Sequence, residues 1–112
     1  MKYKKKDAKE YAFQNMQGIW AAALNPFNND CSLDEKGLRS NLRHWIDDLE
    51  IDGFFISGKQ GEFFSMSLEE RKKSFLIAVE ECDGKAQTIA SCSDQNFDTV
   101  MELAKYSENI GA

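Results

Sequence analysis

Residues 54–66 read FFISGKQGEFFSM, and this stretch decides how the fold is interpreted. An apolar run typical of a buried strand is followed at once by Lys59 and Gln60, which stand between Gly58 and Gly61. Glycine lets the backbone turn sharply and lets backbone N–H groups approach a ligand closely. The stretch therefore predicts a strand that ends in a ligand-binding loop.

Two further apolar runs have a similar composition. The three predicted strands span residues 19–24 (IWAAAL), 53–57 (GFFIS) and 87–92 (QTIASC). None of them alternates cleanly between polar and apolar residues, which indicates strands buried on both faces, as in a parallel sheet. The intervening segments are long enough for βαβ units, and right-handed crossovers would place all helices on one side of a sheet that rolls.

An amphipathic helix is predicted after each strand. Ser32 with Glu35, and Ser67 with Glu70, have the spacing of a capping box, so the first two helices should begin there. The third should begin near residue 96 and end at a glycine, residue 111. The positions expected to face the core are Leu38, Leu42, Trp45, Ile46 and Leu49, then Phe75, Ala78, Val79 and Cys82, then Val100, Leu103, Ala104, Ser107 and Ile110.

Residues 1–17 precede this pattern and are predicted to form a short helical arm. Their basic cluster of Lys2, Lys4, Lys5 and Lys6 is typical of a solvated arm, and binding to a polyanion is the alternative. The net charge of −5 argues against a general nucleic-acid partner. At 112 residues, 42% of them hydrophobic, the chain forms at most one domain but has enough apolar mass for a core.

The sequence contains no apolar run of membrane-spanning length and no signal-peptide pattern, so we expect no membrane partner and a cytoplasmic location. Cys31, Cys82 and Cys92 are widely spaced and odd in number, which favours reduced thiols. Because His44 is the only histidine, a zinc site has too few ligands, and we expect no metal. His44 itself is predicted to be an exposed or half-buried helical residue.

Ligands of parallel α/β sheets gather at the carboxyl ends of the strands. Three predicted loops occupy that edge, at residues 25–32, 58–66 and 93–96. The sequence G-x-x-G-E at residues 58–62 is neither a phosphate-binding P-loop nor a dinucleotide fingerprint. Taken alone, it is either a binding loop or a tight turn with a structural glutamate.

The surrounding motifs resemble the N-terminal part of the dihydrodipicolinate synthase/N-acetylneuraminate lyase family. The resemblance runs in order through residues 18–112 and includes Pro26–Phe27 at the end of the first strand. It continues with residues 30–34, where Cys31 replaces a glycine, with G-x-x-G-E, and with residues 64–71, where Met66 replaces a leucine. The strand TIAS and the segment ELAKYSENIGA also look like that family.

The resemblance implies an α/β fold of the (β/α)8 TIM-barrel type. Residues 18–112 would form its first three βα units, an incomplete domain, because a full barrel takes about 250 residues. It also implies an aldolase that binds pyruvate or another 2-oxo acid, needs no cofactor, and is a homo-oligomer when complete. A lysine forms a Schiff base with the ketone in this family, and a tyrosine relays protons. Both belong to later strands, so we expect no catalytic residue in this chain.

The resemblance places the substrate carboxylate on Gly58, Lys59, Gln60 and Gly61, through backbone N–H groups and hydroxyls. It makes Glu62 and Pro26 loop-supporting residues. Two departures stand out: lysine and glutamine replace the usual Thr or Ser pair, and Asn25 replaces a Thr before Pro-Phe. The backbone donors survive the first change, and Lys59 would add positive charge if it points inward.

Three alternatives to this reading remain. Lys59 could itself be the nucleophile, but a Schiff-base lysine needs a desolvated pocket that a loop on an open sheet does not offer. The chain could be a non-catalytic remnant that survives as an associating module, since open strand edges promote association. It could also be an unrelated small α/β domain that binds phosphate at the Lys59 loop.

Overall fold

Three parallel strands form the sheet of this chain. The computed structural model describes residues 3–112, so the prediction for Lys2 lies outside the described residues. The strands are β1 (Trp20–Ala22), β2 (Gly53–Ile56) and β3 (Gln87–Ala90), in the spatial order β1-β2-β3. Both pairings are parallel, as expected. Each strand is shorter than its predicted run, because the residues at the run ends already belong to the loops.

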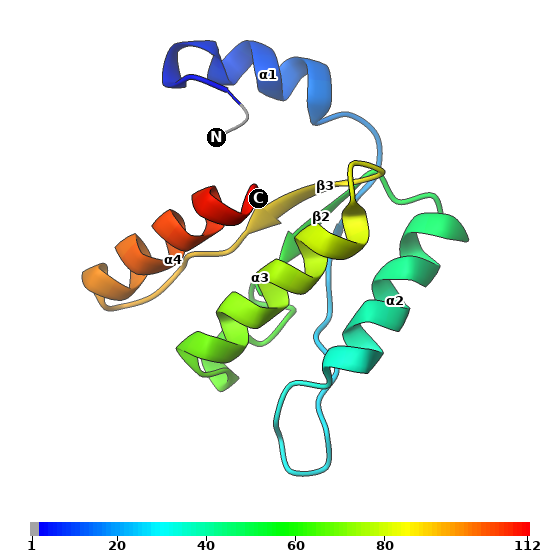
Figure 1. Ribbon diagram of the computed structural model, residues 1–112, viewed down its shortest axis with the longest axis vertical. Helices are drawn as coiled ribbons and strands as arrows, with labels where there is room; N and C mark the ends of the chain where they lie inside the picture. The colour runs from blue at the N-terminus through cyan, green and yellow to red at the C-terminus, as the bar shows by residue number, and fades with distance from the viewer. Residues whose placement is uncertain (1–2) are drawn as a thin grey trace.

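Three helices cover one face of this sheet (Figure 1). Their bounds are α2 (Glu35–Asp47), α3 (Leu68–Cys82) and α4 (Phe97–Ile110), and α1 (Ala8–Asn15) forms the expected helical arm. Short 3-10 turns lie at η1 (Lys5–Asp7) and η2 (Phe63–Ser65). Among residues 3–112, no helix combines the length and the apolar character that a membrane span requires.

The core lies between the sheet and the helix layer. Phe54 and Ile56 of β2 are buried there against Leu38 and Leu42 of α2 and Phe75 of α3. The prediction that the strands are buried on both faces was wrong, because Phe55, which lies between the two buried residues of β2, is 36% exposed. The helices cover only one face, and the opposite, apolar face remains open in the described residues.

The observed helix caps agree with the predicted ones except at the start of α2. The capping box of Ser67 and Glu70 is confirmed at the start of α3. The predicted box of Ser32 and Glu35 was wrong: Asp34 caps α2 by accepting a hydrogen bond from the N–H of residue 37, and Ser32 instead bonds to the Asp30 carboxylate. The other caps, at residues 96 and 111, are confirmed.

Two residues expected in the core are exposed. Leu49 is 54% exposed because α2 ends at Asp47, before the chain completes the turn that would bring Leu49 inward. Ala104 is exposed because it lies on the flank of α4 away from α3, where it lines a groove shared with β3 and the arm. Leu103 and Ser107 of α4 are buried as predicted.

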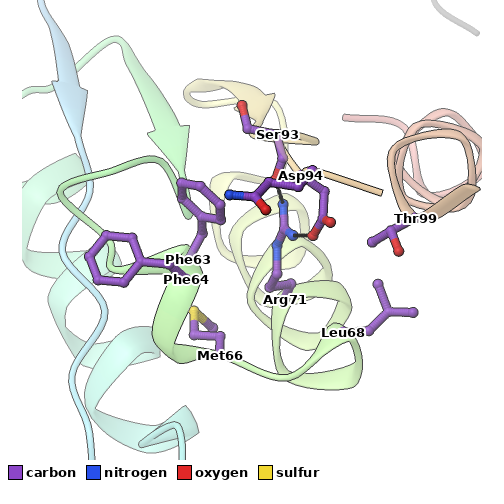
Figure 2. A pocket seen from close by; sticks show the side chains of 9 residues that line it. Phe63, Phe64, Met66, Leu68, Arg71, Ser93, Asp94 and Thr99 are labelled. Atoms are coloured by element: carbon purple, nitrogen blue, oxygen red, sulfur yellow. Dashed lines mark hydrogen bonds and ion pairs between the residues drawn. The ribbon is translucent and has the colours of Figure 1, made fainter. Parts of the chain in front are cut away.

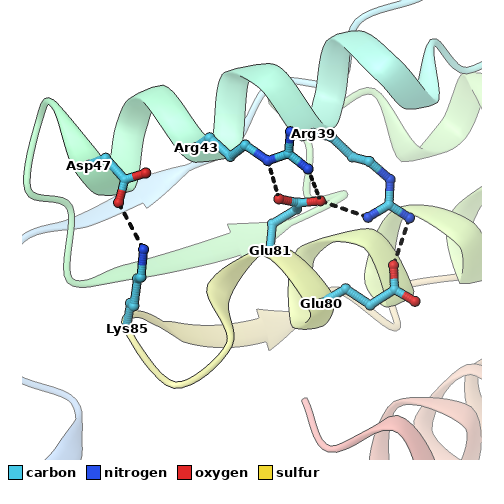
Figure 3. A network of polar contacts seen from close by, with 6 residues as sticks. All are labelled: Arg39, Arg43, Asp47, Glu80, Glu81 and Lys85. Carbon is cyan, nitrogen blue, oxygen red and sulfur yellow. Dashed lines mark hydrogen bonds and ion pairs between the residues drawn. The ribbon is translucent and has the colours of Figure 1, made fainter.

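Ion pairs join α2 and α3 on the outside of the helix layer (Figure 3). The Glu81 carboxylate lies 2.7 Å from Arg39 Nη1 and 2.6 Å from Arg43 Nε. Glu80 pairs with Arg39 as well. The hydrogen bond from Arg43, more than that from Arg39, holds the pKa of Glu81 below its ordinary value despite partial desolvation. The network ties the last turn of α3 to the middle of α2.

The arm and the single histidine lie away from the carboxyl ends of the strands. Tyr11 of α1 donates a hydrogen bond from its hydroxyl to Gln87 Oε1 at 3.4 Å, and Gln87 is the first residue of β3. His44 is exposed and contacts Asp48 on its own helix at 2.6 Å, in agreement with the prediction of a helical surface histidine.

Candidate functional site

The candidate site is the turn formed by residues 58–61 at the carboxyl end of β2. The Gly58 and Gly61 positions are buried, whereas Lys59 and Gln60 are exposed. The turn closes through two backbone hydrogen bonds, from the N–H of Phe63 to the Gly58 carbonyl at 3.4 Å and from the N–H of residue 62 to the Lys59 carbonyl at 3.1 Å. The two central side chains therefore project from a turn whose ends are anchored.

Close packing explains why glycines bracket the turn. A Cβ atom at Gly61 would lie 3.0 Å from each of Ala23 O, Asn25 Nδ2 and Ser57 Cα, which are buried and cannot easily move away. A Cβ atom at Gly58 would overlap the Phe55 ring, which is partly exposed and can rotate. A glycine is therefore more strictly required at position 61 than at position 58.

The backbone donors of this turn are unused. Within the described part of the chain, the N–H groups of residues 58–61 donate to no acceptor. Consecutive backbone N–H groups at a turn form a concave positive surface that binds anions. Hydrogen bonds from N–H groups to a charged acceptor are about twice as strong as neutral ones. The turn has the donors that a carboxylate or a phosphate would need.

A buried polar cluster supports the turn from below. The side-chain amide of Asn25, which follows β1, donates from Nδ2 to Ser57 Oγ at 3.0 Å and to the Gly61 carbonyl at 2.8 Å. Ser57 Oγ lies 2.6 Å from Ser74 Oγ of α3. This cluster connects the ends of β1 and β2 with α3 directly under the candidate site.

The two residues predicted to support the loop contribute mainly through their backbone. The Pro26 carbonyl accepts a hydrogen bond from the N–H of Asp34 at 2.9 Å and so closes the first loop. Glu62 is exposed and has a left-handed backbone, with φ of 57°, and its carbonyl accepts from the N–H of Ser65 at 2.8 Å. Their assignment to a substrate site stays a prediction, as does that of residues 58–61.

Arg71 is a site residue that the sequence analysis missed. It lies on α3, is 3% exposed, and donates from Nη2 to the carbonyls of Ser91 and Ser93, both at 2.9 Å. Its Nη1 pairs with Asp94 at 3.1 Å, and the Phe63 ring covers the guanidinium at 5.0 Å. Burial lowers the pKa of Arg71, and the Asp94 charge opposes that shift. Arg71 thus ties the third loop to the second.

A groove of about 620 Å³ opens beside this arginine (Figure 2). It lies between the loop that follows β2 and the loop that follows β3, and Phe63, Met66 and Arg71 are among its lining residues. Glu70, next to Arg71, accepts from the N–H of Leu33 at 2.9 Å in addition to capping α3. The backbone bonds from Ser67 and Leu33 lower the pKa of Glu70. All three loops are therefore joined to the first turns of α3.

The parallel βα units bring their three loops together at the carboxyl edge of the sheet, and comparisons with known proteins identify the family of this α/β fold. The family described as the Dihydrodipicolinate synthetase family matches residues 15–112. The N-acetylneuraminate lyase of Fusobacterium nucleatum is 40% identical over 96 residues, which is 86% of this chain and 33% of that protein. Its crystal structure superposes with a TM-score of 0.82 over the same shares of the two chains.

Two further solved structures are similar. CdNal from Clostridium difficile, in complex with mannosamine, is 38% identical with a TM-score of 0.82, over 86% of this chain and 33% of that one. A prophage protein of the dihydrodipicolinic acid synthase family from E. coli K12, in complex with pyruvate, is 27% identical with a TM-score of 0.77, over 85% of this chain and 32% of that one.

The chain belongs to the dihydrodipicolinate synthetase family and matches an N-terminal segment of it. Its fold is that of the corresponding part of a TIM barrel, as the resemblance implied. The chain spans about a third of the length of the curated relatives it matches. Family membership overturns the alternative of an unrelated small α/β domain.

Proposed function

We propose that this chain supplies the carboxylate-binding turn of a lyase or aldolase that acts on pyruvate or another 2-oxo acid. The observation that carries the proposal is the row of unused N–H groups at residues 58–61, on a turn braced from below at the carboxyl edge of the sheet. The pyruvate complex of the E. coli family member supports a 2-oxo acid as the ligand class. Lys59 adds a positive charge beside the donors.

The proposal assigns binding and not catalysis to this chain. Lys59 is exposed, so it lacks the desolvated surroundings that make a lysine a good nucleophile. The Schiff base and the proton relay are assigned to a lysine and a tyrosine of later strands in the family fold. We expect borohydride treatment in the presence of pyruvate to leave the 112-residue chain unmodified, as judged by its mass. A stable pyruvate adduct would overturn this division of roles.

A second candidate function is that of a non-catalytic associating module. The open face of the sheet favours it: Phe55 is 36% exposed, and Leu24, just beyond β1, is 59% exposed. The outer edges of β1 and β3 have no partner strand in the described residues. Exposed apolar surface and open strand edges both favour association. The two candidates differ in whether a 2-oxo acid binds.

Calorimetric titration of the 112-residue chain with pyruvate tests the proposal. Pyruvate should bind with a dissociation constant of about 1 mM, because a few charge-assisted bonds at an open site yield about 4 kcal/mol. Methyl pyruvate, which has no carboxylate, should not bind. Binding of inorganic phosphate without any response to pyruvate would contradict the proposal and favour a phosphate site.

Two variants separate the backbone of the turn from its side chains. Lys59→Ala keeps every N–H donor and should weaken pyruvate binding by less than about tenfold, the effect of losing one exposed charge. Gly61→Val places a branched side chain against Ala23 and Asn25 and should abolish binding. Equal affinities for the two variants would show that the turn is not the binding element.

A further inference from the structure

We propose that Asn25 is a positioning residue that holds the turn 58–61 in its anion-binding shape. This inference rests on the proposed function, because it concerns the same site. Asn25 is 9% exposed and reaches from the end of β1 to the Gly61 carbonyl, the last carbonyl of the turn. The Gly61 carbonyl shares its peptide plane with the N–H of residue 62, so this hydrogen bond holds the end of the turn and limits the directions that the preceding N–H groups can take.

The direction of each hydrogen bond in the cluster follows from the carbonyls at its ends. The carbonyl of Arg71 can only accept, so Ser74 donates its hydroxyl hydrogen there, at 2.8 Å. Ser57, 2.6 Å from Ser74 Oγ, must then be the donor in that pair. Its oxygen is left to accept from Asn25 Nδ2, at 3.0 Å. The chain of bonds therefore runs one way, from Asn25 through the two serines to α3.

The same reasoning fixes the orientation of the Asn25 amide. Nδ2 has two hydrogens, which go to Ser57 Oγ and to the Gly61 carbonyl. An amide rotated by half a turn would place Oδ1 against the Gly61 carbonyl, where two acceptors would face each other. In the observed orientation Oδ1 is buried, and no donor reaches it from the part of the chain that the structure describes. The cluster thus leaves Asn25 Oδ1 unsatisfied, while the two Nδ2 hydrogens bond to the Gly61 carbonyl of the turn and to Ser57 beneath it.

Asn25 is one of two groups that hold the last peptide plane of the turn, which contains the Gly61 carbonyl and the N–H of residue 62. The N–H of residue 62 donates to the Lys59 carbonyl at 3.1 Å, and Asn25 Nδ2 donates to the Gly61 carbonyl at 2.8 Å. The contact between Asn25 Nδ2 and Met66 Sδ, at 3.2 Å, adds packing and no third hydrogen bond, since both hydrogens are already used. Loss of the Asn25 donor should therefore leave this peptide plane held by the longer backbone bond alone and loosen the Gly61 end of the turn.

Asn25→Asp gives a readout that a purely structural role would not produce. A protonated aspartic acid can still donate to the Gly61 carbonyl, whereas an ionised one only accepts and faces that carbonyl with a negative charge. Burial favours the neutral acid and raises the pKa of the new carboxyl. Pyruvate affinity of Asn25→Asp should therefore fall as the pH rises, by about tenfold once the carboxyl is ionised. Wild-type affinity should stay within about twofold between pH 5 and 8, since the wild-type amide does not titrate.

The other charged groups at this edge are the same in both proteins, so the comparison isolates the new carboxyl. They are Asp30 and Asp34 in the first loop, Lys59 and Glu62 on the turn, Glu70 and Arg71 on α3, and Asp94 after β3. His44 lies on α2, paired with Asp48 and away from this edge of the sheet. Both proteins are also placed in a His44→Gln background as a control, in which the pH profiles should be unchanged.

A matched pair covers the case in which Asn25→Asp does not fold. Asn25→Thr retains a hydroxyl that can donate to the Gly61 carbonyl, and Asn25→Val has the same shape without the donor. The threonine variant should bind pyruvate within about threefold of wild type, and the valine variant at least about tenfold more weakly. Equal affinities for the two variants would overturn the inference, as would a wild-type affinity and flat pH profile for Asn25→Asp.

A measurement without ligand separates this inference from the proposed function. Backbone amide signals of residues 59–61 in Asn25→Asp should shift with pH in a nitrogen–proton correlation spectrum, and those of wild type should not. If wild type fails to bind pyruvate while these shifts occur, the proposed function fails and the positioning role stands. If wild type binds pyruvate and the signals of the variant do not move, the positioning role fails alone.

Discussion

Replacing Arg71 by methionine removes the buried donor that joins the second and third loops. Methionine keeps the apolar stem of the side chain and deletes the bonds to the carbonyls of Ser91 and Ser93 and the pair with Asp94. Ser91 is 3% exposed, so its abandoned carbonyl should destabilise the fold by about 1–3 kcal/mol. Asp94 is partly exposed, and its ion pair adds about 0–1 kcal/mol.

One feature of the wild type reduces this loss. Arg71 Nε is buried and has no hydrogen-bond partner among residues 3–112, and the substitution removes that unsatisfied donor. We therefore expect a net destabilisation of about 2 kcal/mol. The matched control is Lys73→Met on the same helix. The Lys73 side chain is 47% exposed, and its Nζ lies 3.9 Å from Glu35. The control should change the free energy of unfolding by less than about 0.5 kcal/mol.

Urea unfolding followed by far-ultraviolet circular dichroism measures both variants, at one protein concentration because the chain is expected to associate. Arg71→Met should lower the unfolding midpoint, and amide hydrogen exchange should accelerate most in residues 93–96. Equal midpoints for Arg71→Met and Lys73→Met would refute the reasoning, since they would show that the arginine bonds contribute no more than a surface ion pair.

Three further predictions concern the core, the helix layer and the open sheet. Leu42→Ala should destabilise the fold by about 2–5 kcal/mol, because Leu42 is fully buried; a urea midpoint unchanged from wild type would contradict this. The lowered pKa of Glu81 stabilises the fold at pH values above the ordinary pKa of a glutamate, and this stability should be lost as the pH falls below that value and through the lowered pKa. Glu81→Gln should therefore lose less stability over that range, and parallel pH–stability curves for the two proteins would exclude this linkage. The isolated chain should sediment as oligomers or aggregates through its open sheet face, and a monodisperse, cooperatively unfolding monomer would count against that surface argument.

The features predicted correctly from the sequence depend on local signals. The three strands lie within their apolar runs, and the capping box of Ser67 and Glu70 involves residues within one helical turn. Such contacts are determined by neighbours in the sequence, so a pattern is enough to find them. The turn at residues 58–61 could be located in the same way, because glycines bracket it directly after a strand.

The features that were missed depend on residues far apart in the sequence. Ser32 and Asp34 can both cap a helix. Asp34 caps α2 in the structure, because Leu33 beside it is buried and donates its N–H to Glu70 of α3. Arg71 occupies the inward stripe of α3, but its acceptors lie some 20 residues away on another loop. Asn25 could be singled out as a departure from the family pattern, yet its support of Gly61, 36 residues on, required the coordinates.

The amide signals of residues 58–61 test the central claim most directly. In a titration of the nitrogen-15-labelled chain with pyruvate, the account predicts that these signals move together, saturably and to lower field, as their N–H groups bind the carboxylate. Signals elsewhere, such as those of the arm at residues 8–15, should stay in place. Saturable shifts confined to another surface, or no shift at residues 58–61 up to tens of millimolar pyruvate, would contradict the account.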